Sequence, residues 1–372
     1  MTEKMTYANS GVNYDTMDFF KRVVQLEGQQ TRKNIERINN GEFREVEMSR
    51  GESVFLIETP DSYLAHVEEG LGTKNLIADE MYQVSEWWSY YEYIAQDTVA
   101  MIVNDMITLG ARPLSAAMHL AVGDSNWFND KKRCFNLAAG WRNACNLAGC
   151  IWGNGETPTL KDIIAPETFV LSGSAIGIIK PKERLINPNS IQDGDAIILI
   201  ESSGIHANGL TLARKVADNL PARYATMIEG NQTFGEKLLI PTLIYVKLVE
   251  ECLNYGLKIH YAVNITGHGW RKLMRAKKPF AYIIERLPKQ LLIFDFLQKM
   301  GPIDDYEAYA TFNMGAGFAL YVPESDADAI LEVAASQKFG ALNAGHIDKS
   351  DIRKVAIKPK NLEYCSETLG IR

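Results

Sequence analysis

A short polar loop carries the side chains with the clearest chemical potential. Residues 201–209 read Glu-Ser-Ser-Gly-Ile-His-Ala-Asn-Gly; an apolar run at 195–200 precedes them, and helical spacing at 210–220 follows. A strand, a Ser/Gly/Asn loop and a helix in this order direct backbone N–H groups and the helix dipole at one point, where phosphate or carboxylate binds well. His206 and Asn208 can donate to such an anion, and His206 can also move a proton. The alternative interpretation is a helix capped by Asn208 beside a solvent-facing His206.

Acidic and glycine-rich residues in the first half predict a site for phosphates and a cation. Residues 68–74 read Glu-Glu-Gly-Leu-Gly-Thr-Lys after an expected strand. Lys74 and the glycines could therefore contact phosphates while Glu69 holds a cation. The spacing is not that of a Walker A loop, so the pattern by itself is weak.

Three further carboxylates could complete this site. Asp97 and Asp105 are eight residues apart in a segment of helical spacing, and therefore lie on nearly the same side of that helix. Glu156 belongs to the segment 153–157, which we interpret as a turn after a strand at 150–152. Oxygen ligands spread over several elements suit Mg²⁺ carrying phosphates, because this ion needs few protein ligands. The alternative makes Asp97 a helix cap and Glu156 an ordinary turn residue.

Composition excludes several classes of protein. The chain has 372 residues, of which 46% are hydrophobic, and this length predicts two domains. Its net charge of −7 and the lack of a long basic run argue against nucleic acid as a partner. No apolar stretch approaches the roughly 20 residues that cross a bilayer, and the N-terminus lacks the apolar region of a signal peptide. Five cysteines without a CxxC pattern favour a reducing cytoplasm.

Alternating strand and helix patterns predict α/β architecture. In the first half we expect strands at 63–67 and 114–122, a buried strand at 168–179, and helices at 97–109 and 136–147. Residues 180–190 contain two prolines and several charges, so we place the boundary there, between domains 1–182 and 183–372. In the second half we expect helices at 242–255 and 324–337 and strands at 258–265 and 305–322, the latter interrupted at 311–317.

Taken together, these segments resemble the aminoimidazole ribonucleotide synthetase family, also called phosphoribosylformylglycinamidine cyclo-ligases. The similar stretches occur in the family's order, from the N-terminus nearly to the C-terminus. They include residues 7–12, 70–74, 99–105, 110–113, 149–157, 202–209, 239–247, 266–269 and 311–317. The agreement in order makes the match far more specific than any single motif.

The resemblance implies a fold and a reaction. It implies a homodimer in which residues 1–182 of each chain form an ATP-binding domain. The sheets of the two N-terminal domains join into a barrel, and the C-terminal α/β domain packs alongside. It also implies that ATP and Mg²⁺ drive closure of formylglycinamidine ribonucleotide to aminoimidazole ribonucleotide, with release of ADP and phosphate. ATP would phosphorylate the amide oxygen, and the amidine nitrogen would then expel phosphate, so the protein mainly positions groups and neutralises charge.

With the family motifs, the predicted site has four groups of residues. The catalytic residues are His206 and Lys74. The nucleotide-binding residues are Gly70, Gly72, Thr73, Lys74, Asn104 and Thr157. The substrate-binding residues are Ser203, Gly204, His206, Asn208, Thr266, Gly267 and Asn313. The metal ligands are Glu69, Asp97, Asp105 and Glu156.

The chain departs from the family pattern around the nucleotide. Glu69 replaces the usual Asp, residues 39–45 stand where a glycine-rich stretch is usual, and Met118 lies where the family has Phe-Leu-Asp. The usual triple glycine is Gly-His-Gly at 267–269. These changes leave two alternatives: another ATP-dependent enzyme of the superfamily with a different substrate, or a non-catalytic dimeric paralogue. Selenophosphate synthetase fits poorly, since it needs a reactive residue near the N-terminus and the first cysteine is Cys134.

Overall fold

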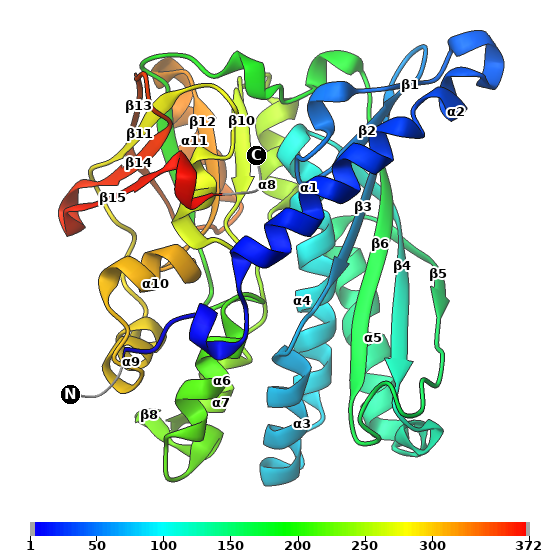
Figure 1. Cartoon of the computed structure of the whole chain (residues 1–372), viewed down its shortest axis with the longest axis vertical. Helices are drawn as coiled ribbons and strands as arrows, with labels where there is room; N and C mark the ends of the chain where they lie inside the picture. Colours follow the sequence, from blue (N-terminus) through cyan, green and yellow to red (C-terminus); the bar gives the residue numbers. More distant parts are fainter. Residues whose placement is uncertain (1–3, 370–372) are drawn as a thin grey trace.

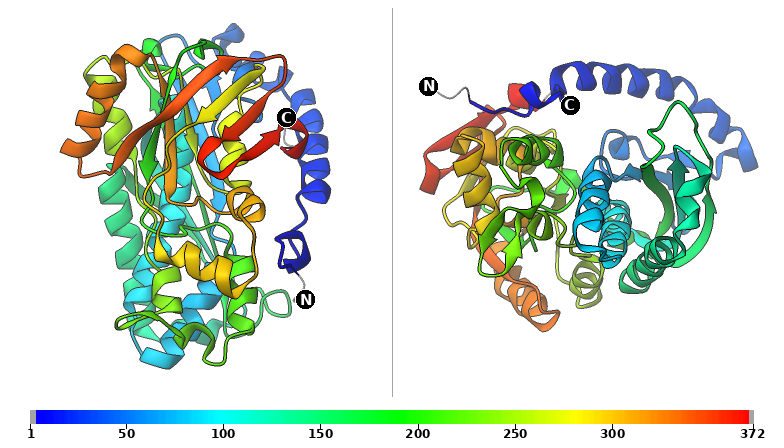
Figure 2. Two further views of the ribbon diagram at one scale, coloured as in Figure 1. Left: turned by 90° about the vertical axis from the view of Figure 1, so that its left-hand side faces the viewer. Right: turned by 90° about the horizontal axis from the view of Figure 1, so that it is seen from below.

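The computed structural model describes residues 4–369 and has mixed α/β architecture. Two large sheets lie side by side, each with its own helices, and a long N-terminal helix crosses both (Figures 1 and 2). The first sheet has strand order β1-β2-β3-β6-β4-β5, and the second has order β10-β12-β7-β13-β11-β14-β15. The predicted fold class is confirmed. No helix of residues 4–369 has the length and apolar character that a bilayer span requires.

The N-terminal sheet is antiparallel except for the parallel β4–β5 pair. Its strands are β1 (Arg44–Glu45), β2 (Phe55–Glu58), β3 (Tyr63–Gly70), β4 (Arg112–Val122), β5 (Ile151–Glu156) and β6 (Phe169–Ile179). Helices α3 (Lys74–Ser85), α4 (Ser89–Met106) and α5 (Lys131–Ala148) lie on one side of it (Figure 2). Inward and outward residues alternate along β3 and β6, which is the pattern of a sheet covered on one face only.

The C-terminal sheet is more deeply buried. Its strands are β7 (Ala196–Glu201), β10 (Tyr261–Asn264), β11 (Phe280–Ile284), β12 (Ala316–Val322), β13 (Ala341–Lys349), β14 (Lys354–Ile357) and β15 (Leu362–Cys365). The surrounding helices are α6 (Leu210–Asp218), α7 (Phe234–Leu238), α8 (Val246–Asn254), α9 (Leu292–Met300), α10 (Asp305–Thr311) and α11 (Ala327–Ser336). A small hairpin of β8 (Met227–Glu229) and β9 (Gln232–Thr233) follows α6. Every residue of β12 is buried, as expected for an apolar run inside an α/β core.

Helix α1 (Tyr14–Gln30), followed by the short α2 (Lys33–Glu36), had no counterpart among the predicted elements. It runs across the front of the molecule from the C-terminal sheet to the N-terminal sheet (Figures 1 and 2). Apolar side chains remain exposed along it, and three of them, Met17, Phe20 and Val24, line a cleft beneath it. The helix therefore forms one wall of the space between the two sheets.

Most predicted elements are present, and four details were wrong. Residues 305–311 form helix α10 instead of a strand, because Asp304 caps it by accepting from the Glu307 N–H. The strand at 168–179 is not buried throughout, since Val170 and Ile176 are exposed. Glu156 lies inside β5 rather than on a turn. The helix predicted at 242–255 begins at Val246, because residues 240–245 form an irregular segment whose backbone is hydrogen-bonded to α4.

Candidate active site

Lys74 and Asp97 form a buried ion pair, not part of an open phosphate site. The Lys74 Nζ lies 2.7 Å from the Asp97 Oδ2, and both side chains are 0% exposed. The ammonium group also donates to the carbonyl oxygens of His206 at 3.0 Å and Ile240 at 3.1 Å. Burial lowers the pKa of Lys74 and raises the pKa of Asp97, and their mutual attraction opposes both shifts. Lys74 therefore ties the N-terminal domain to two segments of the C-terminal domain.

Polar side chains of α4 hold the irregular segment 240–245 in the same region. Asp97 Oδ1 accepts from the Thr242 backbone N–H at 2.8 Å and from its hydroxyl at 2.5 Å. Asn104 donates to the Leu243 carbonyl at 2.8 Å and accepts from the Tyr245 N–H at 2.9 Å. Asp97 is thus neither a helix cap nor exposed to a ligand. We call the set Lys74, Asp97, Asn104 and Thr242 the interdomain clasp.

His206 turns inward and belongs to the scaffold around this clasp. It has a positive φ of 60° and is 4% exposed, so the solvent-facing alternative is also wrong. The His206 Nε2 accepts from the Ser203 N–H at 3.2 Å, and its carbonyl accepts from Lys74. Burial, followed by the charge of Lys74, lowers the pKa of His206 to about 3. This low pKa keeps the imidazole neutral near pH 7, so it would not act as a readily protonated donor there.

The predicted substrate residues divide into two sets. Asn313 is buried; it accepts from the Ser202 hydroxyl at 2.9 Å and donates to the Gly204 carbonyl at 2.8 Å, while the Ser203 hydroxyl donates to the Pro241 carbonyl at 2.6 Å. These contacts shape the loop itself. Asn208, Thr266 and Gly267 instead line an open cleft.

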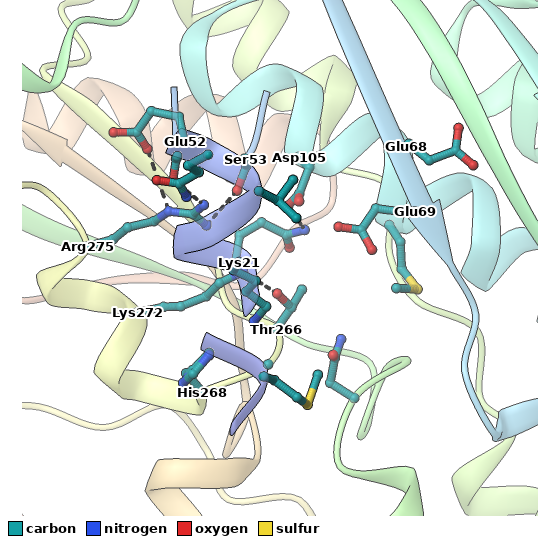
Figure 3. A pocket seen from close by; sticks show the side chains of 18 of the residues that line it. Lys21, Glu52, Ser53, Glu68, Glu69, Asp105, Thr266, His268, Lys272 and Arg275 are labelled. Atoms are coloured by element: carbon teal, nitrogen blue, oxygen red, sulfur yellow. Dashed lines mark hydrogen bonds and ion pairs between the residues drawn. The ribbon is translucent and has the colours of Figure 1, made fainter. Parts of the chain in front are cut away.

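This cleft lies between the two domains and beside α1, with a volume of about 820 Å³. Its walls come from α1, the loop before β2, β3, α4 and residues 264–275, so segments far apart in sequence meet there (Figure 3). It is large enough for a nucleotide-sized ligand.

An acid pair lies on the N-terminal wall of the cleft. Glu69, near the end of β3, and Asp105, near the end of α4, both line the cleft, and their carboxyl groups lie close enough to affect one another electrostatically. Burial, followed by the charge of Asp105, raises the pKa of Glu69 to about 8, so the Glu69 carboxyl group retains its proton more readily than an isolated one. Across the domain boundary, the Asn264 amide donates to Asp105 Oδ1 at 2.7 Å.

The opposite wall carries positive charge. Lys272 lies in the short 3₁₀ helix Gly269–Met274, and its Nζ donates to the Thr266 hydroxyl and to the Asn264 carbonyl, the latter at 3.3 Å. Arg275 donates to the Ser53 hydroxyl and the Gly51 carbonyl, each at 2.9 Å. Figure 3 shows Lys272, Arg275 and His268 on one side of the cleft, facing Glu69 and Asp105 on the other.

The four predicted metal ligands do not gather at one point. Asp97 is enclosed in the clasp, Glu69 and Asp105 meet in the cleft, and Glu156 is exposed on the edge strand β5. Among residues 4–369, no three His, Cys, Asp or Glu side chains are arranged to hold a metal ion. The Glu69–Asp105 pair fits Mg²⁺, since both carboxyl groups line an open cleft and this ion needs few protein ligands because it keeps several waters.

Comparison with known proteins identifies the family. The model described as "AIR synthase related protein, N-terminal domain" matches residues 53–179, and the corresponding C-terminal domain matches residues 192–358. A phosphoribosylformylglycinamidine cyclo-ligase of Methanocaldococcus jannaschii is 35% identical over 78% of this chain and 80% of that protein. The chain belongs to the AIR synthase family. A cyclo-ligase of Methanosarcina mazei is 31% identical over 95% of this chain and 99% of that protein.

Solved structures share the fold of this AIR synthase-family chain at low identity. The HypE-HypF complex matches with a TM-score of 0.61 and 16% identity, over 91% of this chain and 98% of that chain. PurL of Thermotoga maritima, complexed with ADP, matches with a TM-score of 0.55 and 15% identity, over 86% of this chain. This chain covers 46% of that PurL chain, and hence just under half of its length.

Sequence reasoning missed several residues of the cleft in this family member. Lys21, Asn264, Lys272 and Arg275 were not predicted, although all four line it. A signal existed for Lys272, because it lies three residues after the Gly-His-Gly turn at the end of a strand. Spacing alone could not distinguish it from the exposed lysines nearby, since its burial depends on the meeting of the two domains.

Proposed function

We propose that this AIR synthase-family protein uses ATP to close the ring of formylglycinamidine ribonucleotide, giving aminoimidazole ribonucleotide, ADP and phosphate. The relatives named for this reaction, which match most of the chain, support the proposal. The interdomain cleft, with an acid pair on one wall and cations on the other, carries it. Such a cleft suits a reaction in which charged phosphates and an uncharged amide must meet away from bulk water.

The chain's own residues bind and orient both reactants in this mechanism. Glu69 and Asp105 would hold Mg²⁺, which when bound supplies charge neutralisation to the nucleotide phosphates. Asn264 fixes Asp105 from the opposite domain, while Asn208, Thr266 and Gly267 offer polar groups to the ribonucleotide. Because both reacting groups belong to one substrate, holding them close accounts for much of the acceleration.

The nucleotide would enter along the N-terminal wall. The structural relative solved with ADP supports nucleotide binding by this fold. Gly70, Gly72 and Thr73 follow Glu69 directly, so they would lie beside phosphates held by the acid pair. We retain Thr157 and Glu156 as proposed nucleotide and metal residues on the strength of the resemblance.

We also propose a homodimer formed through the N-terminal domain, residues 1–182, with 183–372 as the second domain. The outer face of the N-terminal sheet exposes apolar side chains that its helices do not cover: Leu64, Leu114, Ile151, Val170 and Ile176. A contiguous apolar sheet face and an unpaired edge strand favour association. A cytoplasmic location is consistent with five free cysteines.

An assay of ADP release, with and without formylglycinamidine ribonucleotide, tests the reaction. We expect release that depends on the ribonucleotide and yields aminoimidazole ribonucleotide in equal amount. Nucleotide binding without turnover would instead support a non-catalytic paralogue, and turnover with another amide would support a different substrate.

Light scattering tests the dimer. We expect the mass of two chains at micromolar concentration for the native protein and of one chain for Ile176→Asp, which places a charge on the apolar face. The exposed Ile352→Asp, on the C-terminal domain, is the matched control and should remain dimeric. A monomeric native protein would contradict this proposal.

A further inference from the structure

Lys272 occupies a position in the cleft that the proposed reaction has not yet used. It is 6% exposed, yet it lines the open volume rather than the core of either domain. Its ammonium group is held by two contacts, the Thr266 hydroxyl and the Asn264 carbonyl. A buried cation fixed in the wall of a cleft is costly to maintain, so its position calls for a functional explanation.

Asn264 connects this lysine to the acid pair. Its carbonyl accepts from Lys272, while its side-chain amide donates to Asp105. The charges of Asp105 and Glu69 act directly on Lys272 and oppose the lowering of its pKa by burial. The two domains therefore place a cation and two carboxyl groups around one small volume (Figure 3).

The other nearby cationic side chains are held by contacts away from the acid pair. Lys74, which sequence reasoning assigned to phosphate, is enclosed in the interdomain clasp. Arg275 binds the Ser53 hydroxyl and the Gly51 carbonyl, and Lys21 on α1 is paired with Asp18 at 3.0 Å with a partly exposed side chain. Lys272 is thus the cation that faces both the acid pair and the open volume.

We propose that Lys272 binds the phosphoryl group while it passes from ATP to the substrate amide oxygen. The inference rests on the proposed function. The bond between the γ-phosphorus and its bridging oxygen breaks as the amide oxygen bonds to that phosphorus, and ADP departs with the electron pair. The amidine nitrogen then attacks the amide carbon, the carbon–oxygen bond breaks, phosphate leaves, and the nitrogen releases its proton to phosphate or water. Lys272 donates to an oxygen of the phosphoryl group throughout.

The geometry explains why this placement would help. A metal on Glu69 and Asp105 would approach the phosphates from the N-terminal wall, and Lys272 would approach them from the C-terminal wall, where the ribonucleotide would lie. A fixed and nearly buried cation stabilises developing phosphoryl charge far more than one in bulk water. Thr266 and Asn264 hold the ammonium group in advance, so little reorganisation is needed.

The test compares Lys272→Met and Lys272→Arg with Lys277→Met, a matched control because Lys277 is exposed only a few residues away. Calorimetry measures the binding of Mg–ADP and of a non-hydrolysable Mg–ATP analogue to each protein. We expect the native protein and Lys277→Met to prefer the analogue. In Lys272→Met, the ratio of the affinity for the analogue to the affinity for ADP should fall about tenfold, while the affinity for ADP itself is kept. In Lys272→Arg, this ratio should fall less.

Turnover gives a second measurement. We expect kcat to fall about 100-fold or more in Lys272→Met, typical of losing one group that stabilises the transition state, and to be unchanged in Lys277→Met. A merely structural lysine would instead lower the affinities for ADP and the analogue together, along with the melting temperature, and this result would overturn the proposal. So would equal affinities of the native protein for the two nucleotides. If Lys272→Met does not fold, Lys272→Arg and Lys272→Gln provide the same comparison.

The two proposals can fail separately. A native protein that never forms aminoimidazole ribonucleotide would refute the proposed function, while the preference for the analogue would still report on Lys272. A native protein that forms the product, with Lys272→Met retaining both its kcat and its preference, would refute only the role of Lys272.

Discussion

Helix α4 carries two aspartates that were expected to act together, and the structure gives them opposite surroundings. Asp97 meets Lys74 and Thr242 in the interdomain clasp, where side chains and backbone groups enclose both charges. Asp105, two turns further on, lines the 820 Å³ cleft together with Glu69. Each aspartate has a lysine nearby, but only the second lysine, Lys272, lies beside space for a ligand.

The difference shows how a structural charge can be distinguished from a functional one. In the clasp, the charges of the acid and the lysine compensate one another, and both side chains form hydrogen bonds with segment 240–245. Removing either partner therefore leaves a buried charge uncompensated. In the cleft, burial and the charge of Asp105 raise the pKa of Glu69, so Glu69 retains a proton that a metal could displace. Four predictions, from the largest expected effect to the smallest, test this contrast.

Removing the acid of the clasp should affect stability most. We expect Asp97→Ala to lower the free energy of unfolding by about 3–5 kcal/mol, because Lys74 would remain buried without its partner. Urea unfolding measures this, and Lys74→Met/Asp97→Leu should lose less because it removes both charges. An Asp97→Ala protein as stable as the native protein would show that the clasp does not hold the domains together.

Removing the acid of the cleft should instead affect activity. Asp105→Asn should lower kcat/KM at least about 100-fold, equivalent to about 2.7 kcal/mol, through loss of metal binding. Its midpoint of thermal unfolding without nucleotide should stay close to the native value, since an amide can still accept from Asn264. Full activity in this variant would remove the acid pair from the proposed mechanism.

The buried imidazole of His206 predicts a dependence of stability on pH. Its pKa is about 3 in the folded chain and about 6.5 when unfolded, so the unfolded chain binds more protons between these values. Stability should therefore fall as pH decreases from 6.5 toward 3, by up to about 1.4 kcal/mol per pH unit from this residue. Urea unfolding of the native protein and of His206→Gln at several pH values measures the difference. If the free energy of unfolding changes equally with pH in the native protein and in His206→Gln, His206 is accessible to protons in the folded chain.

The smallest effect should come from an exposed contact between the same two domains. Arg223 binds Glu80 of α3 at 2.7 and 3.1 Å and Asp218 at 2.6 Å, all at the surface. We expect Arg223→Ala to cost less than about 1 kcal/mol, and less still at high salt, because water and ions screen the pair. A loss as large as that of Asp97→Ala would show that burial is not what distinguishes the clasp.

Periodicity revealed the elements better than it revealed their exposure. The strands at 63–67 and 114–122 and the helix at 136–147 are present because alternation and helical spacing depend on local chain geometry. The helix at 305–311 was missed although Asp304 and Glu307 form a recognisable cap. The strand at 168–179 was expected to be buried because its composition is apolar, but composition does not show which face a neighbouring layer covers.

The sequence alone determined the family, the α/β class and the acidic and glycine-rich segments, because these depend on motif order and local pattern. It also supplied Glu69 and Asp105 as partners in a site. Only the tertiary structure separated Asp97 from Asp105, turned His206 and Lys74 inward, and brought Lys272 to the cleft. The physical reason is that two positions on one helix face can meet different segments of the second domain, and the burial of a charge depends on which segment meets it.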